Sequence, residues 1–214
     1  MDRPELLFVT GCNAAGKSSL IRTHLSQFPD YEIIMTDVYK SRAGEVFKES
    51  VKRRKNIILE TPFNNEGFKN LIDLSKNEGY QATLIVLFLK SPSHSLERVA
   101  ARRTFENGLY ISAEQVEYNF IENFKNVARY SPYFDQAFFI YTGKKDKNEL
   151  IMSFHGNRLS EYKSSDFVYI QKFAEFAFRL QRVSQEDFDI IAANADYRNE
   201  IIKNTQSRYE WGNS

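Results

Sequence analysis

The chain of 214 residues has a single cysteine, Cys12. One cysteine cannot form an internal disulfide, so the sequence predicts a protein of a reducing compartment, which we take to be the cytoplasm. The formal net charge is only +1. A general nucleic-acid binder or a protein that adheres to membrane surfaces carries a large basic excess. We therefore expect neither nucleic acid nor membrane among its partners.

Long apolar runs and targeting patterns are also lacking. The longest apolar run, residues 84–89, is far too short to cross a bilayer. The first residues do not have the charged-then-apolar layout of a signal peptide. The three histidines, His24, His94 and His155, are scattered and do not have the spacing of a metal site. The length leaves room for one domain with a sizeable core, alone or with an appendage.

What the sequence does contain is a complete phosphate-binding loop. Residues 11–18, Gly-Cys-Asn-Ala-Ala-Gly-Lys-Ser, fit the pattern G-x-x-x-x-G-K-[ST]. An apolar run at 6–9 predicts a strand before the loop, and residues 19–25 predict a helix after it, which is the context that this motif needs. The residues predicted to bind the nucleotide are Gly11, Cys12, Asn13, Ala14, Ala15, Gly16, Lys17, Ser18 and Ser19.

The chemistry of this loop comes from its backbone and two side chains. Successive N–H groups and the helix N-terminus point at phosphate oxygens. Lys17 would reach the β- and γ-phosphates of ATP, and the Ser18 hydroxyl would hold Mg²⁺. The alternative is a glycine turn before an ordinary helix.

Strands and helices alternate along the chain, which predicts an α/β fold of the P-loop NTPase type. Strands are expected at 6–9, 31–35, 56–59, 82–89 and 137–141, and helices at 19–25, 42–52, 64–78, 92–103 and 112–128. This order predicts a doubly wound, mostly parallel five-stranded sheet with helices on both faces. Residues 104–111 are expected to be a loop.

The pattern changes beyond the fifth strand. Residues 150–154 and 158–162 flank a turn and predict a hairpin, and an apolar stripe after residue 166 predicts a helical extension. We expect a kinase-like domain at 1–160, a helical extension at 161–205 packed on the same domain, and a disordered polar tail at 206–214.

Ligands on parallel sheets bind at the carboxyl ends of the strands, where two acidic residues follow strands in this chain. Asp37 follows the second strand and could accept the proton of an attacking hydroxyl, or it could cap the next helix. Glu60 follows the third strand and could hold a substrate hydroxyl or a metal-bound water, or it could be a solvated acid.

Arginines cluster on the helix predicted at 92–103. Arg98 and Arg102 are four residues apart and share a helix face, with Arg103 beside them. Like charges at that spacing repel unless phosphates lie between them. Phosphoryl transfer needs such charges, because its transition state spreads negative charge over the moving group. The alternative is a solvated basic face.

Taken together, these segments resemble a known family. The loop at 11–18, Met35-Thr36-Asp37, residues 57–61 (Ile-Ile-Leu-Glu-Thr) and residues 96–102 (Leu-Glu-Arg-Val-Ala-Ala-Arg) resemble the zeta-toxin-like P-loop kinases, and more closely their branch of bacterial predicted ATPases. The resemblance covers roughly residues 5–160.

The resemblance implies an ATP- and Mg²⁺-dependent phosphotransferase acting on a hydroxyl of a small molecule, since zeta-type enzymes phosphorylate UDP-N-acetylglucosamine. It makes Lys17 the phosphate ligand, Ser18 the metal ligand and Asp37 the general base. It places Glu60, with Thr61 beside it, at the acceptor, and Arg102 with Arg98 over the phosphates. Because some members are toxins neutralised by a small antitoxin protein, it also implies such a protein as a candidate partner.

The chain departs from the family pattern in two places. Relatives carry arginines on the helix that follows the mobile loop, whereas residues 117–120 here read Glu-Tyr-Asn-Phe and Arg129 lies well beyond them. Relatives also have Asp-Asn-Ser after the fifth strand, where this chain has Thr142-Gly143. Two other functions therefore stay open: a nucleotide-binding regulatory module or ATPase without kinase activity, and a different small-molecule kinase on the same scaffold.

Two rival nucleotide-binding classes fit less well. A GTPase needs an Asp-x-x-Gly motif, which is absent, and residues 143–146 imitate its second motif without the asparagine. A transporter-type ATPase needs a Gly-rich signature, which residues 159–161 do not supply.

Overall fold

The computed structural model describes residues 3–106, 111–144 and 147–201. The strands are β1 Glu5–Gly11, β2 Tyr31–Met35, β3 Asn56–Thr61, β4 Gln81–Phe88, β5 Gln136–Lys144, β6 Lys147–His155, β7 Arg158–Tyr162 and β8 Tyr197–Arg198. The helices are α1 Lys17–Thr23, α2 Thr36–Tyr39, α3 Ala43–Lys52, α4 Gly67–Asn77, α5 Pro92–Glu106, α6 Ala113–Tyr130, α7 Val168–Arg179 and α8 Gln185–Ala192. Short 3₁₀ turns occur at η1 Leu25–Gln27, η2 Lys40–Arg42 and η3 Ser131–Tyr133.

The strands form one sheet in the order β2-β3-β1-β4-β5-β6-β7-β8. The five strands from β2 to β5 pair in parallel, as the sequence predicts. The predicted hairpin continues this sheet, because β6 pairs antiparallel to β5, and β7 and β8 follow it. The expected boundary at residues 160/161 therefore falls inside β7.

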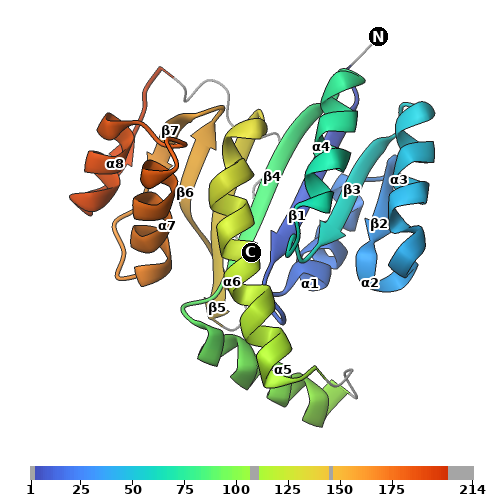
Figure 1. Cartoon of the computed structure of the whole chain (residues 1–214), viewed down its shortest axis with the longest axis horizontal. Helices are drawn as coiled ribbons and strands as arrows, with labels where there is room; N and C mark the ends of the chain where they lie inside the picture. Colours follow the sequence, from blue (N-terminus) through green and yellow to red (C-terminus); the bar gives the residue numbers. More distant parts are fainter. Residues whose placement is uncertain (1–2, 107–110, 145–146, 202–214) are drawn as a thin grey trace.

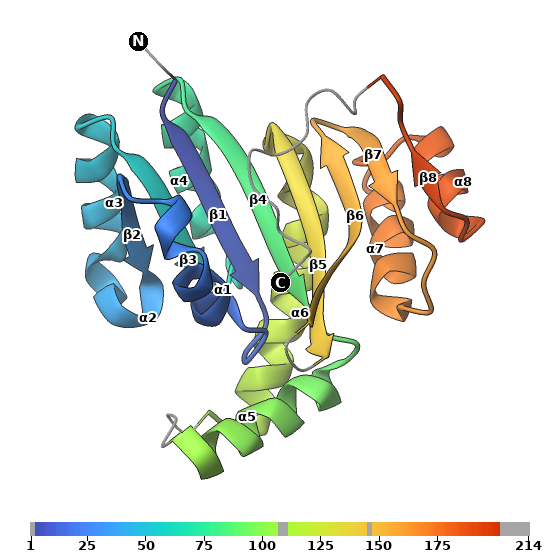
Figure 2. The same cartoon turned by 180° about the vertical axis from the view of Figure 1, so that it is seen from behind.

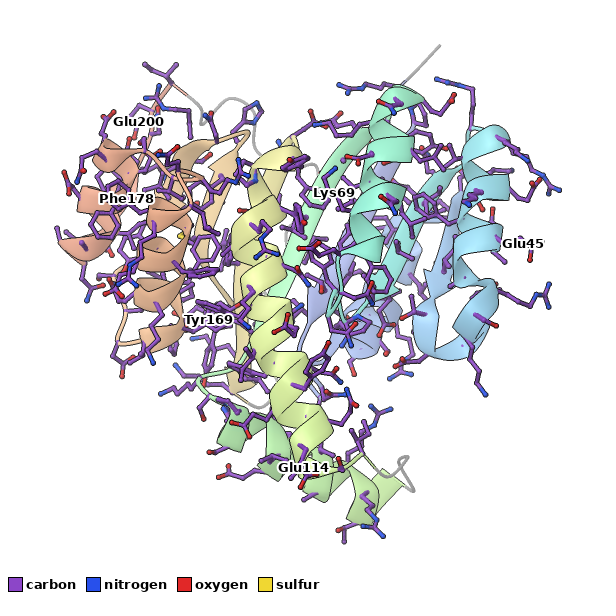
Figure 3. The ribbon with its side chains drawn as sticks, viewed as in Figure 1. Glu45, Lys69, Glu114, Tyr169, Phe178 and Glu200 are labelled. Carbon is purple, nitrogen blue, oxygen red and sulfur yellow. The ribbon has the colours of Figure 1, made fainter. Side chains whose placement is uncertain are left out.

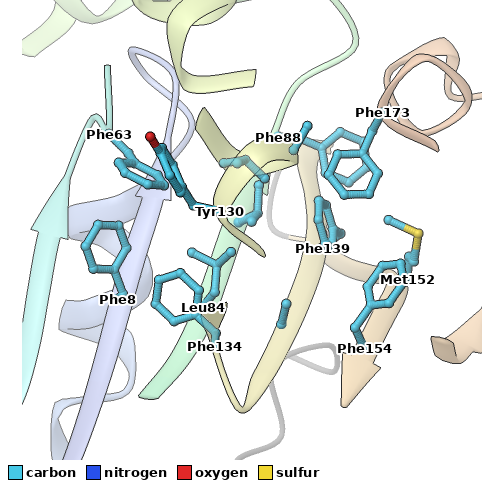
Figure 4. Close-up of a cluster of buried hydrophobic side chains, with 14 of the residues drawn as sticks. Phe8, Phe63, Leu84, Phe88, Tyr130, Phe134, Phe139, Met152, Phe154 and Phe173 are labelled. Atoms are coloured by element: carbon cyan, nitrogen blue, oxygen red, sulfur yellow. The ribbon is translucent and has the colours of Figure 1, made fainter. Parts of the chain in front are cut away.

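Alternating side chains of each strand enter two different cores. In β1, Leu6 and Phe8 pack on the face covered by α3, α4, α6, α7 and α8, whereas Leu7 and Val9 pack on the face that carries α1. Figure 4 shows the aromatic core of the first face, where Phe8 lies near Phe63 and Phe134. Burial on both faces explains why the strands read as continuous apolar runs.

Several helices begin or end at residue types that favour helix ends. Ser112 caps α6 by accepting from the Gln115 N–H, and Ser184 caps α8 by accepting from the Asp187 N–H. Pro92 opens α5, and Gly79 follows α4 with a φ of 80°.

Two local expectations were incomplete, and a third is not tested by the structure. Helix α5 continues to Glu106, so part of the predicted loop at 104–111 is helical; Thr104 donates to the Ala100 carbonyl within this extra turn, and residues 107–110 lie outside the described part. The short elements α2 and β8 were not predicted, because four- and two-residue elements have no readable periodicity. The predicted tail at 206–214 lies outside the described residues.

The topology places the phosphate-binding loop at the centre of the sheet edge. Strand β1 lies between β3 and β4. After β1 the chain passes β3 to form β2 at the edge of the sheet, and after β3 it crosses to the other side of β1 to form β4. Such a switch point leaves a crevice at the carboxyl ends of the strands. Helix α5 projects beyond this edge, and α6 returns across it (Figure 1).

Candidate active site

The loop between β1 and α1 has the backbone of an anion-binding turn. Ala14 and Gly16 have positive φ values of 54° and 89°, and the Ala15 N–H donates to the Cys12 carbonyl at 3.3 Å. A non-glycine residue in this conformation is strained, and strain of this kind gathers at functional sites. Alternating left- and right-handed residues turn successive N–H groups toward one point, which suits a phosphate.

Lys17 lies over this loop. Its Nζ donates to the Gly11 carbonyl at 3.0 Å and to the Cys12 carbonyl at 3.1 Å. The ammonium group is therefore held against the loop, where it could reach a phosphate bound by the N–H groups.

Ser18 and Glu60 are in direct contact, although they are 42 residues apart. The Ser18 hydroxyl donates to Glu60 Oε1 at 3.0 Å. Glu60 is 4% exposed, and its Oε2 has no hydrogen-bond partner among the described residues. Burial raises the pKa of the Glu60 carboxyl; Lys17 and the Ser18 hydrogen bond oppose this rise, and the charge of Asp37 adds to it.

This donor set fits a magnesium ion. Mg²⁺ takes one or two carboxylates, hydroxyls and waters together with substrate phosphates, and it needs no cluster of several acidic ligands. A buried carboxylate oxygen without a partner is costly unless a cation or water approaches it. Ser18 and Glu60 are the residues that would hold the ion, together with phosphate oxygens and water. The described residues contain no separate metal site made of three or more His, Cys, Asp or Glu side chains.

The other predicted site residues lie at different distances from this centre. Asp37 is exposed in the first turn of α2, close enough to influence Glu60 electrostatically. The alternative role of Asp37 as a helix cap is wrong, because Met35 is the N-cap residue of α2 and Arg42 is that of α3. Thr61 is fully buried, and its hydroxyl accepts from the Phe63 N–H at 3.1 Å, so its side chain is used within its own loop.

The two arginines of α5 differ. Arg98 is half-buried, and its Nη1 donates to the Thr142 carbonyl at 2.5 Å. Thr142 in turn donates through Oγ1 to the Ala15 carbonyl at 2.7 Å, which joins the end of β5 to the phosphate-binding loop. Arg102 is exposed one turn further along α5. The structure thus brings Arg98 to the loop and leaves Arg102 on the helix surface.

The sequence reasoning missed several polar residues of this region. Asn119 of α6 donates to Asn13 Oδ1 of the loop at 2.8 Å, and Asn123 donates to Thr10 Oγ1 at the end of β1 at 2.8 Å. Ser95 of α5 donates to the Asn13 carbonyl at 2.7 Å. The readable signal was the spacing of amide residues along α6, which repeats every three or four positions on one helix face.

The helical extension also reaches the loop. Tyr169 of α7 lies beside α6 (Figure 3). It is buried, its ring stacks on Phe88 of β4, and it meets Phe124 of α6 edge-on. Its hydroxyl has no hydrogen-bond partner among the described residues. Burial raises the pKa of the Tyr169 phenol, and the neighbouring Cys12 adds to this rise. Burial also raises the pKa of the Cys12 thiol, against the influence of Lys17 and Ser95.

A parallel sheet with a glycine-rich loop and its lysine after the central strand defines the P-loop kinase fold. Residues 27–154 match the family model described as Zeta toxin. Because the match covers more than half of the chain, the chain belongs to the zeta toxin family. No curated protein matches the sequence.

Solved structures share the fold at low sequence identity. A chain of the PezAT chromosomal toxin-antitoxin system of Streptococcus pneumoniae matches with a TM-score of 0.55 and 14% identity, over 91% of this chain and 85% of that one. A chain of the native AvrRxo1-ORF1:-ORF2 complex matches with a TM-score of 0.59 and 13% identity, over 92% and 77%. The same complex with ATP matches with a TM-score of 0.56 and 13% identity, over 91% and 77%.

In the described part of the chain, no helix combines the length and the apolar character that a bilayer span requires.

Proposed function

We propose that the protein is an ATP-dependent phosphotransferase that moves the γ-phosphate of ATP to a hydroxyl group of a small molecule. The observation that carries the proposal is the contact between Ser18 and Glu60 beside the strained loop that holds Lys17. This arrangement brings together a cation, a buried carboxylate and the N–H groups of the loop, which supports binding of a phosphate with a magnesium ion. The family and a related structure that contains ATP support it.

Each residue has a distinct part in this reaction. Lys17 would exchange its carbonyl partners for the β- and γ-phosphates, and Arg98 would add positive charge from the α5 side. Ser18 and Glu60 would hold Mg²⁺, which when bound neutralises charge on the phosphates. Asp37 would accept the proton of the attacking hydroxyl, because it is a solvent-exposed carboxylate whose charge reaches the Glu60 site. Arg102 would have to approach the phosphates by a movement of α5.

The proposal is tested in two steps. Calorimetry with MgATP should give measurable affinity for the wild type and none for Lys17→Ala, because that change removes the ammonium group. An ATP-consumption screen over sugar nucleotides and small alcohols should then identify an acceptor, with UDP-N-acetylglucosamine tested first because of the family. Absence of MgATP affinity in the wild type contradicts the proposal.

Asp37→Ala distinguishes the proposal from a nucleotide-binding module without transfer. Loss of the base should reduce phosphoryl transfer by about 10²–10⁴-fold while leaving MgATP affinity close to that of the wild type. A wild type that binds MgATP but transfers phosphate to no acceptor favours the binding module.

The toxin-antitoxin description of the S. pneumoniae relative makes a small neutralising protein a reasonable partner to seek for this chain as well.

A further inference from the structure

Four amide side chains lie on one face of α6; three of them are buried against the loops after β1 and β3, and the fourth, Gln115, is exposed and contacts Asn119. They are Gln115, Asn119, Asn123 and Asn126, which are three or four residues apart and share one helix face. The three asparagines are 7%, 3% and 2% exposed. Buried amides need hydrogen-bond partners, and their partners therefore tell which parts of the chain this helix holds in place.

Asn119 connects the two loops through one side chain. Its Nδ2 donates to Asn13 Oδ1 in the phosphate-binding loop at 2.8 Å. Its Oδ1 accepts from Asn64 Nδ2 in the loop after β3 at 2.7 Å, and from Gln115 Nε2 at 2.9 Å. Because the same amide donates to one loop and accepts from the other, a shift of either loop moves Asn119 and so changes its hydrogen bond to the other loop.

The loop after β3 is held in a strained conformation by the same helix. Phe63 is fully buried and has a φ of 46°, which is rare for a bulky residue. Asn123 donates to the Pro62 carbonyl at 2.7 Å, and Asn126 donates to the Phe63 carbonyl at 3.0 Å. A strained segment persists when its surroundings over-determine it. Residues 61–66, which we call the acceptor-side loop because they follow Glu60, are therefore held in place by α6.

Neither an apolar nor an acidic residue could replace this amide. Leucine at 119 would leave Asn13 Oδ1 and Asn64 Nδ2 without their partner. Aspartate would accept from Asn64 but could not donate to Asn13, and it would bring negative charge toward a phosphate site. The side chain at this position thus combines neutrality with two-sided hydrogen bonding.

We propose that Asn119 is a positioning residue that couples the acceptor-side loop to the phosphate-binding loop, so that ordering one loop favours the binding conformation of the other. Such coupling is reciprocal for binding free energies. The identity of the two ligands depends on the proposed function, whereas the coupling of the two loops is a property of the chain itself.

The test perturbs one loop and measures the other. Asn64→Ala removes the donor from the acceptor-side loop. Amide hydrogen exchange, measured without nucleotide, should then rise in residues 11–18, and the dissociation constant for MgATP should increase by roughly two- to tenfold, the loss expected for one hydrogen bond. Gln115→Ala is the matched control, because it deletes an amide donor to Asn119 and leaves the Asn64–Asn119–Asn13 path intact; it should change exchange in 11–18 little.

A double-mutant cycle separates coupling from general loosening. In the Asn119→Leu background, Asn64→Ala should have no further effect on exchange in 11–18, because the path is already cut. Additive effects, or unchanged exchange in Asn64→Ala alone, overturn the proposal. If Asn119→Leu does not fold, the comparison of Asn64→Ala with Gln115→Ala decides. A wild type without MgATP affinity whose loop exchange still responds to Asn64→Ala contradicts the proposed function and supports the coupling.

Discussion

At the scale of single residues, the phosphate-binding loop depends on two glycines for different reasons. A Cβ at Gly11 would lie 2.3 Å from the Leu87 carbonyl oxygen of β4, and the φ of Gly11 is 155°. A Cβ at Gly16 would meet open space, but the φ of 89° is strained for any other residue. The first glycine therefore allows close approach of two backbones, and the second allows a turn.

This difference predicts unequal effects of the two alanine variants. Gly16→Ala should reduce the free energy of unfolding by about 1–2 kcal/mol, because only backbone strain is added. Gly11→Ala should cost roughly 1–3 kcal/mol more, because the clash with Leu87 must also be relieved. Urea unfolding measures both. Equal losses for the two variants contradict the assignment of a close contact to Gly11.

Glu60 predicts a specific dependence of stability on pH. Burial raises the pKa of this carboxyl from its ordinary value of 4.5, so the folded state holds its proton more tightly than the unfolded state does. Its contribution to the free energy of unfolding is therefore fully present below that ordinary value and is lost as the pH rises through the folded pKa. Glu60→Gln abolishes this loss, since the glutamine can still accept from Ser18.

Urea unfolding of both proteins without Mg²⁺, over a pH series, checks this prediction. The free energy of unfolding of Glu60→Gln relative to that of the wild type should rise from acidic to neutral pH. Parallel curves for the two proteins contradict a raised pKa at Glu60.

At the scale of elements, α6 holds the loops of the site in place, and α7 packs against α6. Helix α6 binds both loops through its amides, and α7 places Tyr169 against α6 and near Cys12. Side chains of α7 pack on the same helix that holds the phosphate-binding loop. A substitution in α7 that shifts α6 should therefore change the conformation of the phosphate-binding loop.

Tyr169 gives a direct test of this packing. Tyr169→Phe keeps the ring and removes a buried hydroxyl that has no partner in the described part of the chain, so stability should rise by about 1 kcal/mol. Tyr169→Ala removes the ring and should cost about 3–5 kcal/mol. Thermal unfolding of both variants measures these changes. A clear loss of stability in Tyr169→Phe means that the hydroxyl has a partner.

At the scale of the whole molecule, one sheet joins the parallel half to the antiparallel half. The β5–β6 pair is continuous with β4–β5, and Phe173 of α7 packs fully buried on Phe139 of β5. Residues from both halves share one hydrophobic core. Folding of the two halves should therefore be a single cooperative event.

A chain that ends at residue 165 tests this cooperativity. This truncation removes α7, α8 and β8, and it exposes buried side chains that pack on α7, such as Phe139 of β5. The truncated protein should lose its sharp unfolding transition and bind a hydrophobic dye, as measured by differential scanning calorimetry and fluorescence. A sharp transition near that of the full chain contradicts a shared core and favours an independent domain at 1–160.

The sequence by itself determined the elements whose signals are local. Apolar runs and caps predicted the five parallel strands and most of the helices, and the spacing of two glycines, a lysine and a serine predicted the phosphate-binding loop. These signals are readable because backbone conformation and strand burial depend on neighbouring residues.

Only the tertiary structure decided which distant side chains meet. The contact of Ser18 with Glu60, the link of Arg98 through Thr142 to Ala15, and the bridge of Asn119 between two loops each join residues far apart in the chain. No local pattern encodes them, because they arise when β1, β3 and β4 end at one edge and α5 and α6 fold across it. The sequence supplied the groups, and the packing of the sheet and its helices determined their neighbours.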